Sequence, residues 1–365
     1  MSRLLMCGWE TGSIQQLGAT SQSYTAPSVA TSAPAPRSGG YYLKCSRVSG
    51  STANSFCWLN VAHAVNSELF YAFGMYRDPV DALSGSPSLN CFRVLDAAGN
   101  VNLVLTCEID GSMRAYVATG GTTAPTTANL TLLGTSTTSV SSLAWHLIEV
   151  HAIAATGATG ALQVRLDGAT VINLTSVRTC QTTASFGQFQ VGLFAYVAGG
   201  NGALFAFDDL RVNTPAGTIN NSWCGDGKIL GLLPNGVGAT IGGTPLTGVP
   251  GSPNWQNVDE VPASVADYNY GSVAGTGELY TLADTTGIVT SCAAVNLIGY
   301  ALNSDAGGGS VGFTMQTSGA ANEAAATPIT ATATYYNRLM ETDPTDNAAW
   351  TQAKLNALQA GITVR

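Results

Sequence analysis

The sequence predicts an all-β protein, with an antiparallel jelly-roll sandwich followed by a second, smaller β-rich domain that ends in a short helix. Apolar and polar residues alternate with a period of two through residues 41–212, which is typical of half-buried strands. Turn residues interrupt this pattern about every ten positions, and a second set of alternating segments covers residues 276–339. Many short strands separated by frequent turns favour a sandwich or jelly roll.

The hairpins of the first domain are marked by two Asp-Gly dipeptides. In the strand expected over residues 101–109, apolar side chains at odd positions alternate with mostly polar ones, and Asp110-Gly111 follows directly. A second alternating segment over residues 162–167 is closed by Gly168 after Asp167. Asp-Gly favours the tight turn of a two-residue hairpin, so each dipeptide predicts two neighbouring antiparallel strands.

The chain divides into three parts by composition. Residues 1–215 are expected to form the sandwich, residues 216–265 a connector rich in Gly, Pro and Asn with little regular structure, and residues 266–365 the C-terminal β-rich domain. Within this last part, strands are expected over residues 276–282, 292–302, 311–316, 330–339 and 362–364.

One short helix is expected near the C-terminus. Thr351 is a good N-cap residue, and Leu355 and Leu358 lie one turn apart on one helix face. Gly361 stands where a left-handed C′ residue would end the helix. Trp350 precedes the cap and is expected to pack back on the helix as a hydrophobic staple.

The surface is predicted to carry unusually little charge. Charged residues make up 10% of the chain, whereas about 25% is usual, and apolar residues make up 45%. This composition excludes a disordered chain, and a net charge of −8 argues against a nucleic-acid partner. An uncharged surface is easily buried against other protein, so we expect a homo-oligomer. The sequence has no apolar run of 18 residues, so we expect no membrane insertion.

The eight cysteines are expected to be buried thiols rather than disulfides or metal ligands. The apolar run at the start of the chain is too short for a signal peptide, so the chain is expected to fold in a reducing cytoplasm. Cys45, Cys91 and Cys107 lie within strand-like segments, and the sequence shows no C-x-x-C pair or zinc-ligand spacing.

Four segments in the first 215 residues resemble a known family: CGWETG at 7–12, WHLIEV at 145–150, VRLDG at 164–168 and FDDLRV at 207–212. Residues 1–215 resemble the concanavalin A-like lectin and glucanase sandwich, in its laminin-G-like branch found in phage proteins. The stretch NNSWCGDGK at 220–228 and the ending around Asp343, Trp350 and residues 361–364 look like those of tailed-phage virion proteins with this domain.

The resemblance implies a non-enzymatic structural component of a tailed-phage particle, such as a tail-tip, fibre or capsid-attached protein, assembled in the host cytoplasm and located on the virion. Its partners would be other virion proteins and further copies of itself, with a trimer as the first guess because trimers are common among fibres of this class. The alternative is a lectin-like receptor-binding protein that recognises a host-surface glycan.

Glucanases of this fold carry an E-x-D-x-E or E-x-D-x-x-E motif, of which Glu108-Ile109-Asp110 is the nearest match. Ser112 and Met113 stand where a third acid would be, and Asp110 belongs to the hairpin turn. A retaining glycosidase needs two carboxyl groups about 5 Å apart. We therefore expect Glu108 and Asp110 to face solvent and the protein to hydrolyse nothing.

No other constellation in the sequence predicts a reaction. Asp208 and Asp209 would point to opposite faces of an alternating strand, which favours strand-end hydrogen bonding over a calcium site. His146 and His151 are five residues apart and face opposite sides, and neither they nor His63 belong to a visible Ser-His-Asp pattern. The sequence thus predicts no enzyme, no cofactor, and no catalytic or metal-binding residue.

The residues that would bind a ligand are left open. Trp58, Tyr71, Tyr76 and Tyr116 would be able to stack on sugar rings if they were exposed. Most aromatic side chains in a sandwich of this size pack in its core, which is the competing interpretation for all four.

Overall fold

The structure of the protein is a computed structural model. It describes residues 1–18, 20–23, 26–47, 56–78, 88–120, 127–194, 203–250, 253–305 and 307–365. It is nearly all β, which confirms the predicted fold class. The chain divides into two compact units, Met1–Leu230 and Gly231–Arg365.

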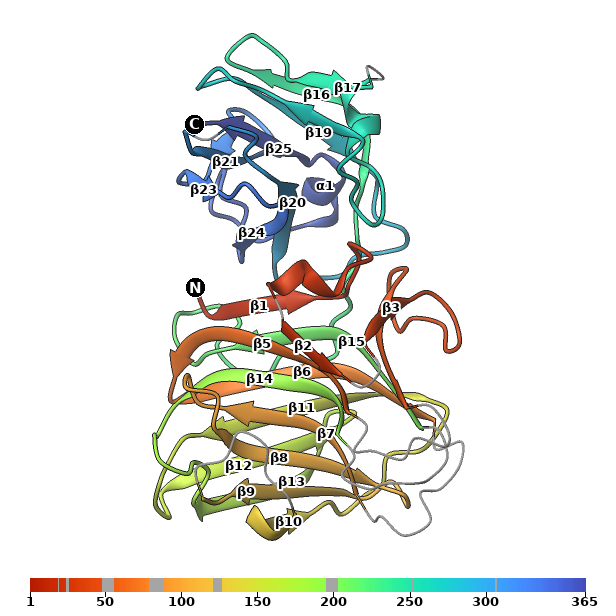
Figure 1. Cartoon of the computed structure of the whole chain (residues 1–365), viewed down its shortest axis with the longest axis vertical. Helices are drawn as coiled ribbons and strands as arrows, with labels where there is room; N and C mark the ends of the chain where they lie inside the picture. Colours follow the sequence, from red (N-terminus) through yellow and green to blue (C-terminus); the bar gives the residue numbers. More distant parts are fainter. Residues whose placement is uncertain are drawn as a thin grey trace. The chain divides into compact units, whose positions relative to one another are not determined.

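The first unit is a sandwich of two antiparallel sheets, which Figure 1 shows as two stacked layers of long strands. Sheet A contains, in spatial order, β13 (Ala169–Val177), β12 (Gly160–Leu166), β11 (Trp145–Ile153), β6 (Glu68–Asp78), β15 (Ala203–Asn213), β4 (Tyr42–Arg47) and β3 (Ser28–Ala30), with β1 (Arg3–Cys7) also paired to β15. Sheet B contains β10 (Leu130–Thr135), β9 (Met113–Ala118), β8 (Val101–Glu108), β7 (Ser88–Leu95), β14 (Phe186–Phe194), β5 (Phe56–Asn66) and β2 (Thr20–Ser23). Two 3₁₀ helices, η1 (Ile14–Leu17) and η2 (Thr127–Asn129), lie in the connections.

The core of the first unit lies between the two sheets and is rich in aromatic rings. Tyr71 packs edge-on against Phe92 and Phe189, with ring centroids 5.2 and 5.6 Å apart. Phe73 contacts both Phe92 and Phe207. Each buried aromatic side chain contributes about 1.5–3 kcal/mol through the area it removes from water. The odd-numbered positions of β6 supply this core, as the period-two pattern predicts.

In its described residues, the second unit contains three smaller sheets. The largest contains β16 (Pro234–Ile241), β19 (Gly277–Leu282), β25 (Gln359–Val364), β21 (Gly309–Gln316) and β22 (Asn322–Glu323), with β23 (Thr327–Ile329) also paired to β21. The two-stranded sheets are β17 (Thr247–Val249) with β18 (Tyr268–Tyr270), and β20 (Val295–Ala301) with β24 (Thr334–Met340). The remaining elements are η3 (Asn254–Asn257) and α1 (Gln352–Asn356).

The expected connector over residues 216–265 does not form a separate segment in this structure. Its first part, up to Leu230, belongs to the first unit, and the rest belongs to the second. β16 lies within it and pairs along its length with β19. The sequence conceals this strand because its glycines lack side chains that would show an alternating pattern.

The C-terminal helix begins as predicted but ends earlier. The Thr351 hydroxyl accepts a hydrogen bond from the backbone N–H of Lys354, at 3.3 Å, so Thr351 is the N-cap. The C-cap is Ala357, whereas Gly361 lies inside β25, opposite Leu279 and Thr314. The prediction that Gly361 ends the helix is therefore wrong. A β-carbon at Gly361 would collide with the carbonyl oxygen of Glu278, so glycine permits close strand pairing there.

Trp350 organises the small core of the second unit. It is 3% exposed and packs with Leu355, Leu358, Met315 and Met340. Its indole N–H donates to the Met340 carbonyl at 3.1 Å. The predicted staple is confirmed, and it joins the helix to β21 and β24.

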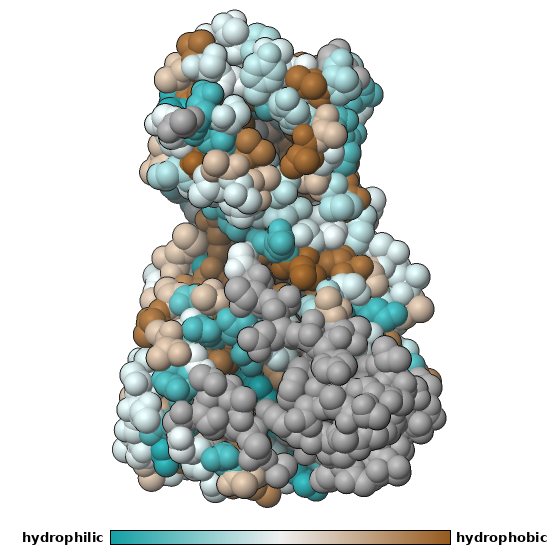
Figure 2. Space-filling view, viewed as in Figure 1, coloured by the Kyte–Doolittle hydropathy of each residue, from teal (hydrophilic) through white to brown (hydrophobic). Residues whose placement is uncertain are grey.

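All eight cysteines are free thiols, six of them buried, as predicted. Figure 2 shows hydrophobic and hydrophilic residues interspersed over a surface of mostly intermediate hydropathy, in keeping with the low content of charge. Among the described residues, no helix has the length and apolar character needed to span a membrane.

Candidate functional site

The outer face of sheet B carries an ordered set of polar, charged and aromatic side chains. On β14, Phe189 and Val191 point into the core. Gln188 and Gln190 therefore point to the opposite face, because successive side chains of a strand alternate. The neighbouring strands follow the same rule, so residues distant in sequence share this face.

A first row of residues crosses five strands of this face in register. Asn60 of β5 pairs with Gln190 of β14, which pairs with Arg93 of β7. Arg93 pairs with Val104 of β8, which pairs with Tyr116 of β9. The row thus runs from amides through a guanidinium to a half-exposed phenol.

A second row lies beside the first. Asn90 of β7 pairs with Phe194 on one side and with Thr106 on the other, and Thr106 pairs with Arg114 of β9. The Phe194 ring stacks on Trp58 with centroids 5.9 Å apart. The guanidinium carbon of Arg93 lies 3.8 Å from the centroid of the same Phe194 ring, a cation–π contact that joins the two rows.

The amides of this face form a short chain of hydrogen bonds. The Asn60 side chain donates to Gln188 Oε1 at 2.9 Å, and Gln190 Nε2 donates to Asn60 Oδ1 at 3.3 Å. Gln190 is 5% exposed, and its Oε1 has no hydrogen-bond partner within the described part of the chain. A buried amide oxygen of this kind is costly unless a ligand or water satisfies it.

Glu108 is buried at 4% exposure, so the expectation that it faces solvent is wrong. Its carboxylate accepts a hydrogen bond from Thr106 Oγ1 at 2.7 Å and lies 3.9 Å from Arg114 Nη1. Burial raises the pKa of Glu108, although Thr106 and Arg114 act in the opposite direction. Asp110 is exposed in the hairpin turn, where hydrogen bonds from Ser112 lower its pKa.

Asp208 and Asp209 do not lie on opposite faces of a regular strand, as the sequence had suggested. A bulge in β15 places both between Phe207 and Leu210, which both point into the core, and Asp209 has a positive φ of 52°. Asp208 Oδ2 accepts from the backbone N–H groups of Arg37 and Ser38, at 2.9 and 3.2 Å. Asp209 binds the Arg37 guanidinium at 2.5 Å.

Both carboxylates are therefore used in fastening the segment around Arg37 to β15. The competing interpretation was a calcium site. Within the described residues, no group of three or more His, Cys, Asp or Glu side chains comes together in a way that would hold a metal ion.

The three histidines have separate environments. His63 lies among core aromatics, 6.0 Å from Phe189 by ring centroids, and burial lowers its pKa. His151 stacks on Phe70 at 4.2 Å and binds Glu68 Oε1 at 2.8 Å.

The sequence showed no Ser-His-Asp pattern, but the structure brings one together. His146 Nε2 lies 2.7 Å from Ser141 Oγ, and its Nδ1 lies 2.7 Å from Asp167 Oδ2. The three residues come from a loop, from β11 and from the turn that joins β12 to β13. Their spacing in sequence matches no motif, which is why sequence reasoning missed them.

The four aromatic candidates divide between core and surface. Tyr71 is fully buried in the core. Trp58 and Tyr116 lie half-buried on the outer face of sheet B, where the two rows run. Tyr76 of β6 packs against Trp145 of β11 with centroids 5.7 Å apart.

No protein-family model matches the chain, and no curated protein matches it. Among solved structures, it is similar to an endo-β-1,4-glucuronan lyase from the fungus Trichoderma reesei (18% identity, TM-score 0.43, 53% of this chain and 90% of the other). It is also similar to an alginate lyase from Aplysia kurodai (13%, TM-score 0.45, 59% and 100%) and to the binding domain of botulinum neurotoxin DC in complex with SialylT (8%, TM-score 0.36, 53% and 43%).

These comparisons correct the functional expectation drawn from the sequence. Several of the similar structures are polysaccharide lyases, which overturns the expectation of a non-enzymatic structural component of a phage particle. The expectation that the chain is not an enzyme is corrected by the same finding.

Proposed function

We propose that the first unit recognises carbohydrate and that it binds an anionic polysaccharide across the outer face of sheet B. The observation that carries this proposal is the first row, in which Asn60, Gln190, Arg93 and Tyr116 lie in register on neighbouring strands. Strands are about 4.8 Å apart, so five strands span roughly 20 Å, which suits an extended chain lying across them.

The charged groups of the face favour an acidic sugar. Arg114 presents a partly exposed guanidinium group, and Arg93, which is 3% exposed, holds a second one against the Phe194 ring. Glu108 and Asp110 are the acids that act on Arg114. Guanidinium groups bind carboxylates through paired, charge-assisted hydrogen bonds. A uronate or sialate residue supplies such a carboxylate.

The uncharged groups suit the rest of a sugar. Amide side chains both donate and accept, as sugar hydroxyl groups do, and Gln190 Oε1 is an acceptor that has no partner among the described residues. Trp58 and Tyr116 are half-buried and offer ring surface for the apolar face of a sugar.

Titration calorimetry with the full chain tests this proposal. We expect binding of alginate or polyglucuronate, weak or no binding of neutral dextran, and an affinity that falls as salt is added. Arg114→Gln should weaken binding about tenfold or more, since a hydrogen bond to a charged group contributes about 1.5–3 kcal/mol. Lys228→Gln is the control: it removes an exposed positive charge that belongs to neither row, and it should leave affinity unchanged. Equal binding by wild type and Arg114→Gln would overturn the proposal.

A second candidate function is cleavage of the bound polyuronate by β-elimination. A hydrogen bond that Arg114 donates to the Tyr116 hydroxyl raises the pKa of Arg114, so a phenol and a guanidinium are in contact on this face. The guanidinium would stabilise charge on the uronate carboxylate while a base removes the proton from C5. The bond from C4 to the glycosidic oxygen then breaks, a C4–C5 double bond forms, and the departing oxygen takes up a proton. The Tyr116 phenol is the candidate for this base. Ultraviolet absorbance should therefore detect unsaturated product with wild type and not with Tyr116→Phe.

A further inference from the structure

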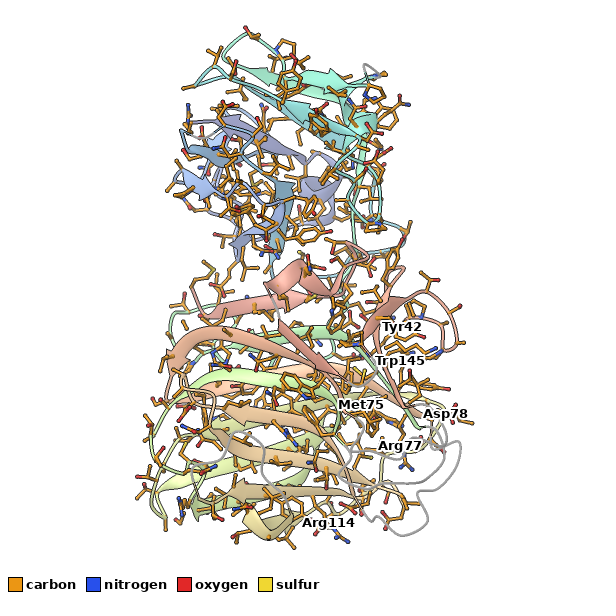
Figure 3. The ribbon with its side chains drawn as sticks, viewed as in Figure 1. Tyr42, Met75, Arg77, Asp78, Arg114 and Trp145 are labelled. Carbon is orange, nitrogen blue, oxygen red and sulfur yellow. The ribbon has the colours of Figure 1, made fainter. Side chains whose placement is uncertain are left out.

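Ser141, His146 and Asp167 form a continuous chain of hydrogen bonds at one end of the sandwich. Ser141 Oγ lies 2.7 Å from His146 Nε2, and His146 Nδ1 lies 2.7 Å from Asp167 Oδ2. His146 follows Trp145 and pairs with Met75 of β6, and Figure 3 labels both of these neighbours. None of the three residues belongs to either row on sheet B.

The partners of the imidazole determine its tautomer. The Asp167 carboxylate has only acceptor oxygens, so the proton between it and His146 belongs on Nδ1. Nε2 is then the ring nitrogen with a free lone pair, and it accepts the hydrogen bond from the Ser141 hydroxyl. This is the arrangement in which an imidazole acts as a general base toward a serine.

Asp167 is held firmly by the backbone. Its Oδ1 accepts from the Leu147 N–H at 2.8 Å, and its own N–H donates to the Leu147 carbonyl at 2.9 Å. Asp167 has a φ of 50°, a left-handed conformation that few non-glycine residues adopt. The turn thus aims the carboxylate at His146, which is what an orienting residue must do.

The loop that carries the serine is also fastened on both sides. The Val140 N–H donates to the Gly111 carbonyl at 2.8 Å, and the Leu143 N–H donates to the Arg77 carbonyl at 2.9 Å. Ser141, between these two anchors, is exposed, while the side chain of His146 is only 14% exposed. A substrate can therefore reach the hydroxyl, while the base behind it is largely shielded from water.

We propose that Ser141, His146 and Asp167 are the nucleophile, base and orienting residue of an acyl-transfer site that hydrolyses small carboxylic esters. Ser141 Oγ attacks the ester carbonyl carbon as His146 Nε2 takes its proton. The C–O bond of the alcohol breaks, and the leaving oxygen takes that proton from His146, which leaves an acyl-serine. Water attacks the acyl-serine in the same way, His146 relays its proton to Ser141, and the carboxylic acid departs.

The surroundings favour an uncharged ester with an apolar acyl group. Leu143 lies two residues from the nucleophile with 63% of its surface exposed and a φ of 60°. An exposed leucine held in a left-handed conformation is unusual, and such strained positions gather at functional sites. In this proposal the acyl group lies against the exposed Leu143 side chain.

Covalent labelling with a fluorophosphonate probe tests the nucleophile, with peptide mass spectrometry to find the modified residue. We expect wild type to be labelled at Ser141 and Ser141→Ala to remain unlabelled. Ser142→Ala, which alters the exposed neighbouring serine, should be labelled as wild type is. Unlabelled wild type, or labelling of Ser141→Ala equal to that of wild type, would overturn the proposal.

Hydrolysis of p-nitrophenyl acetate tests the base and the orienting residue. We expect His146→Ala and Asp167→Asn each to lower the rate at least tenfold, because asparagine would favour the wrong tautomer of the imidazole. Matching melting temperatures would show that these variants are folded. If Asp167→Asn keeps the wild-type rate, Asp167 does not orient His146 for catalysis and this part of the proposal is excluded. Lys228→Gln should hydrolyse the ester as wild type does. Neither experiment uses a polysaccharide, so failure of the glycan proposal and failure of this one are distinguishable.

Discussion

The two units solve the problem of a buried aspartate in opposite ways. In the first unit, Asp208 is fully buried beside a second carboxylate, Asp209, and the nearby Arg37 guanidinium binds Asp209. In the second unit, Asp343 is also fully buried, but it accepts from Thr317 and Thr345 and lies 3.1 Å from the Lys354 ammonium. A buried carboxylate thus stays charged where a cation and hydroxyl groups face it, and tends to be protonated where its neighbour is another acid.

The hydrophobic cores of the two units also differ, in size and in composition. The first unit has a large aromatic core spread over two sheets, whereas the second gathers its described core cluster around Trp350. Small units bury a smaller fraction of their surface, so each core residue matters more there. The second unit is therefore expected to respond more strongly to single substitutions.

The largest expected effect is that of Trp350→Ala. Removing a buried tryptophan costs about 3–5 kcal/mol, a large share of the 5–15 kcal/mol that holds a typical domain together. Hydrogen exchange followed by mass spectrometry should show lost protection in residues 231–365 and unchanged protection in residues 1–230. Ile288→Ala, at a side chain that is 88% exposed, is the matched control. Equal loss of protection in both units would contradict the comparison.

The two aspartates should give stability profiles of opposite slope with pH. Burial, together with the charge of Asp209, raises the pKa of Asp208 to about 8. Since this lies above the unfolded value of about 3.9, its contribution to stability is complete below that value and is lost as pH rises toward 8. The melting temperature of Asp208→Asn, relative to wild type, should therefore increase between pH 4 and pH 9. A constant difference across this range would refute the assignment.

For Asp343, burial acts to raise the pKa, but hydrogen bonds from Thr317, Thr345 and Lys354 outweigh it and lower the pKa below its ordinary value. Its contribution is therefore present above about pH 4 and is lost as pH falls through the folded value. Asp343→Asn should be most destabilised relative to wild type near neutral pH and least so below pH 3. Melting curves that show the reverse order would contradict the role of Lys354.

The smallest expected effect is at the helix cap. Thr351→Ala removes the acceptor of the Lys354 N–H and should cost the second unit about 1 kcal/mol. Thr351→Ser keeps the hydroxyl and should restore most of this loss in urea unfolding. Ser13→Ala removes a similar cap from η1, a single turn in the first unit that has its own large core, and should have less effect. A larger loss from Ser13→Ala than from Thr351→Ala would reverse the comparison.

Much of the fold could be predicted because local patterns record burial directly. The alternation in residues 101–109 identified β8 and its core-facing residues, and Asp110-Gly111 identified the turn to β9. Trp350 and Thr351 identified the last helix and its cap. These signals need only neighbours in sequence, since the period of a strand and the geometry of a cap are local properties.

The candidate sites depended on contacts that no local pattern records. The row from Asn60 to Tyr116 exists because strand order and register place five distant segments side by side. The chain from Ser141 to Asp167 exists because a loop and a hairpin turn meet at His146. A single register shift would disperse the row, because it would turn each side chain to the other face.

The sequence by itself determined that the chain is all-β, where most strands and turns lie, and which side chains avoid water, because alternation and turn chemistry act over a few residues. Only the tertiary structure decided that β16 belongs to a sheet, that Gly361 lies in a strand and that Asp208 and Asp209 share a bulge. It also decided which polar side chains meet. Pairing between distant strands is a property of the whole fold, and the same strand pattern is compatible with many orders of strands.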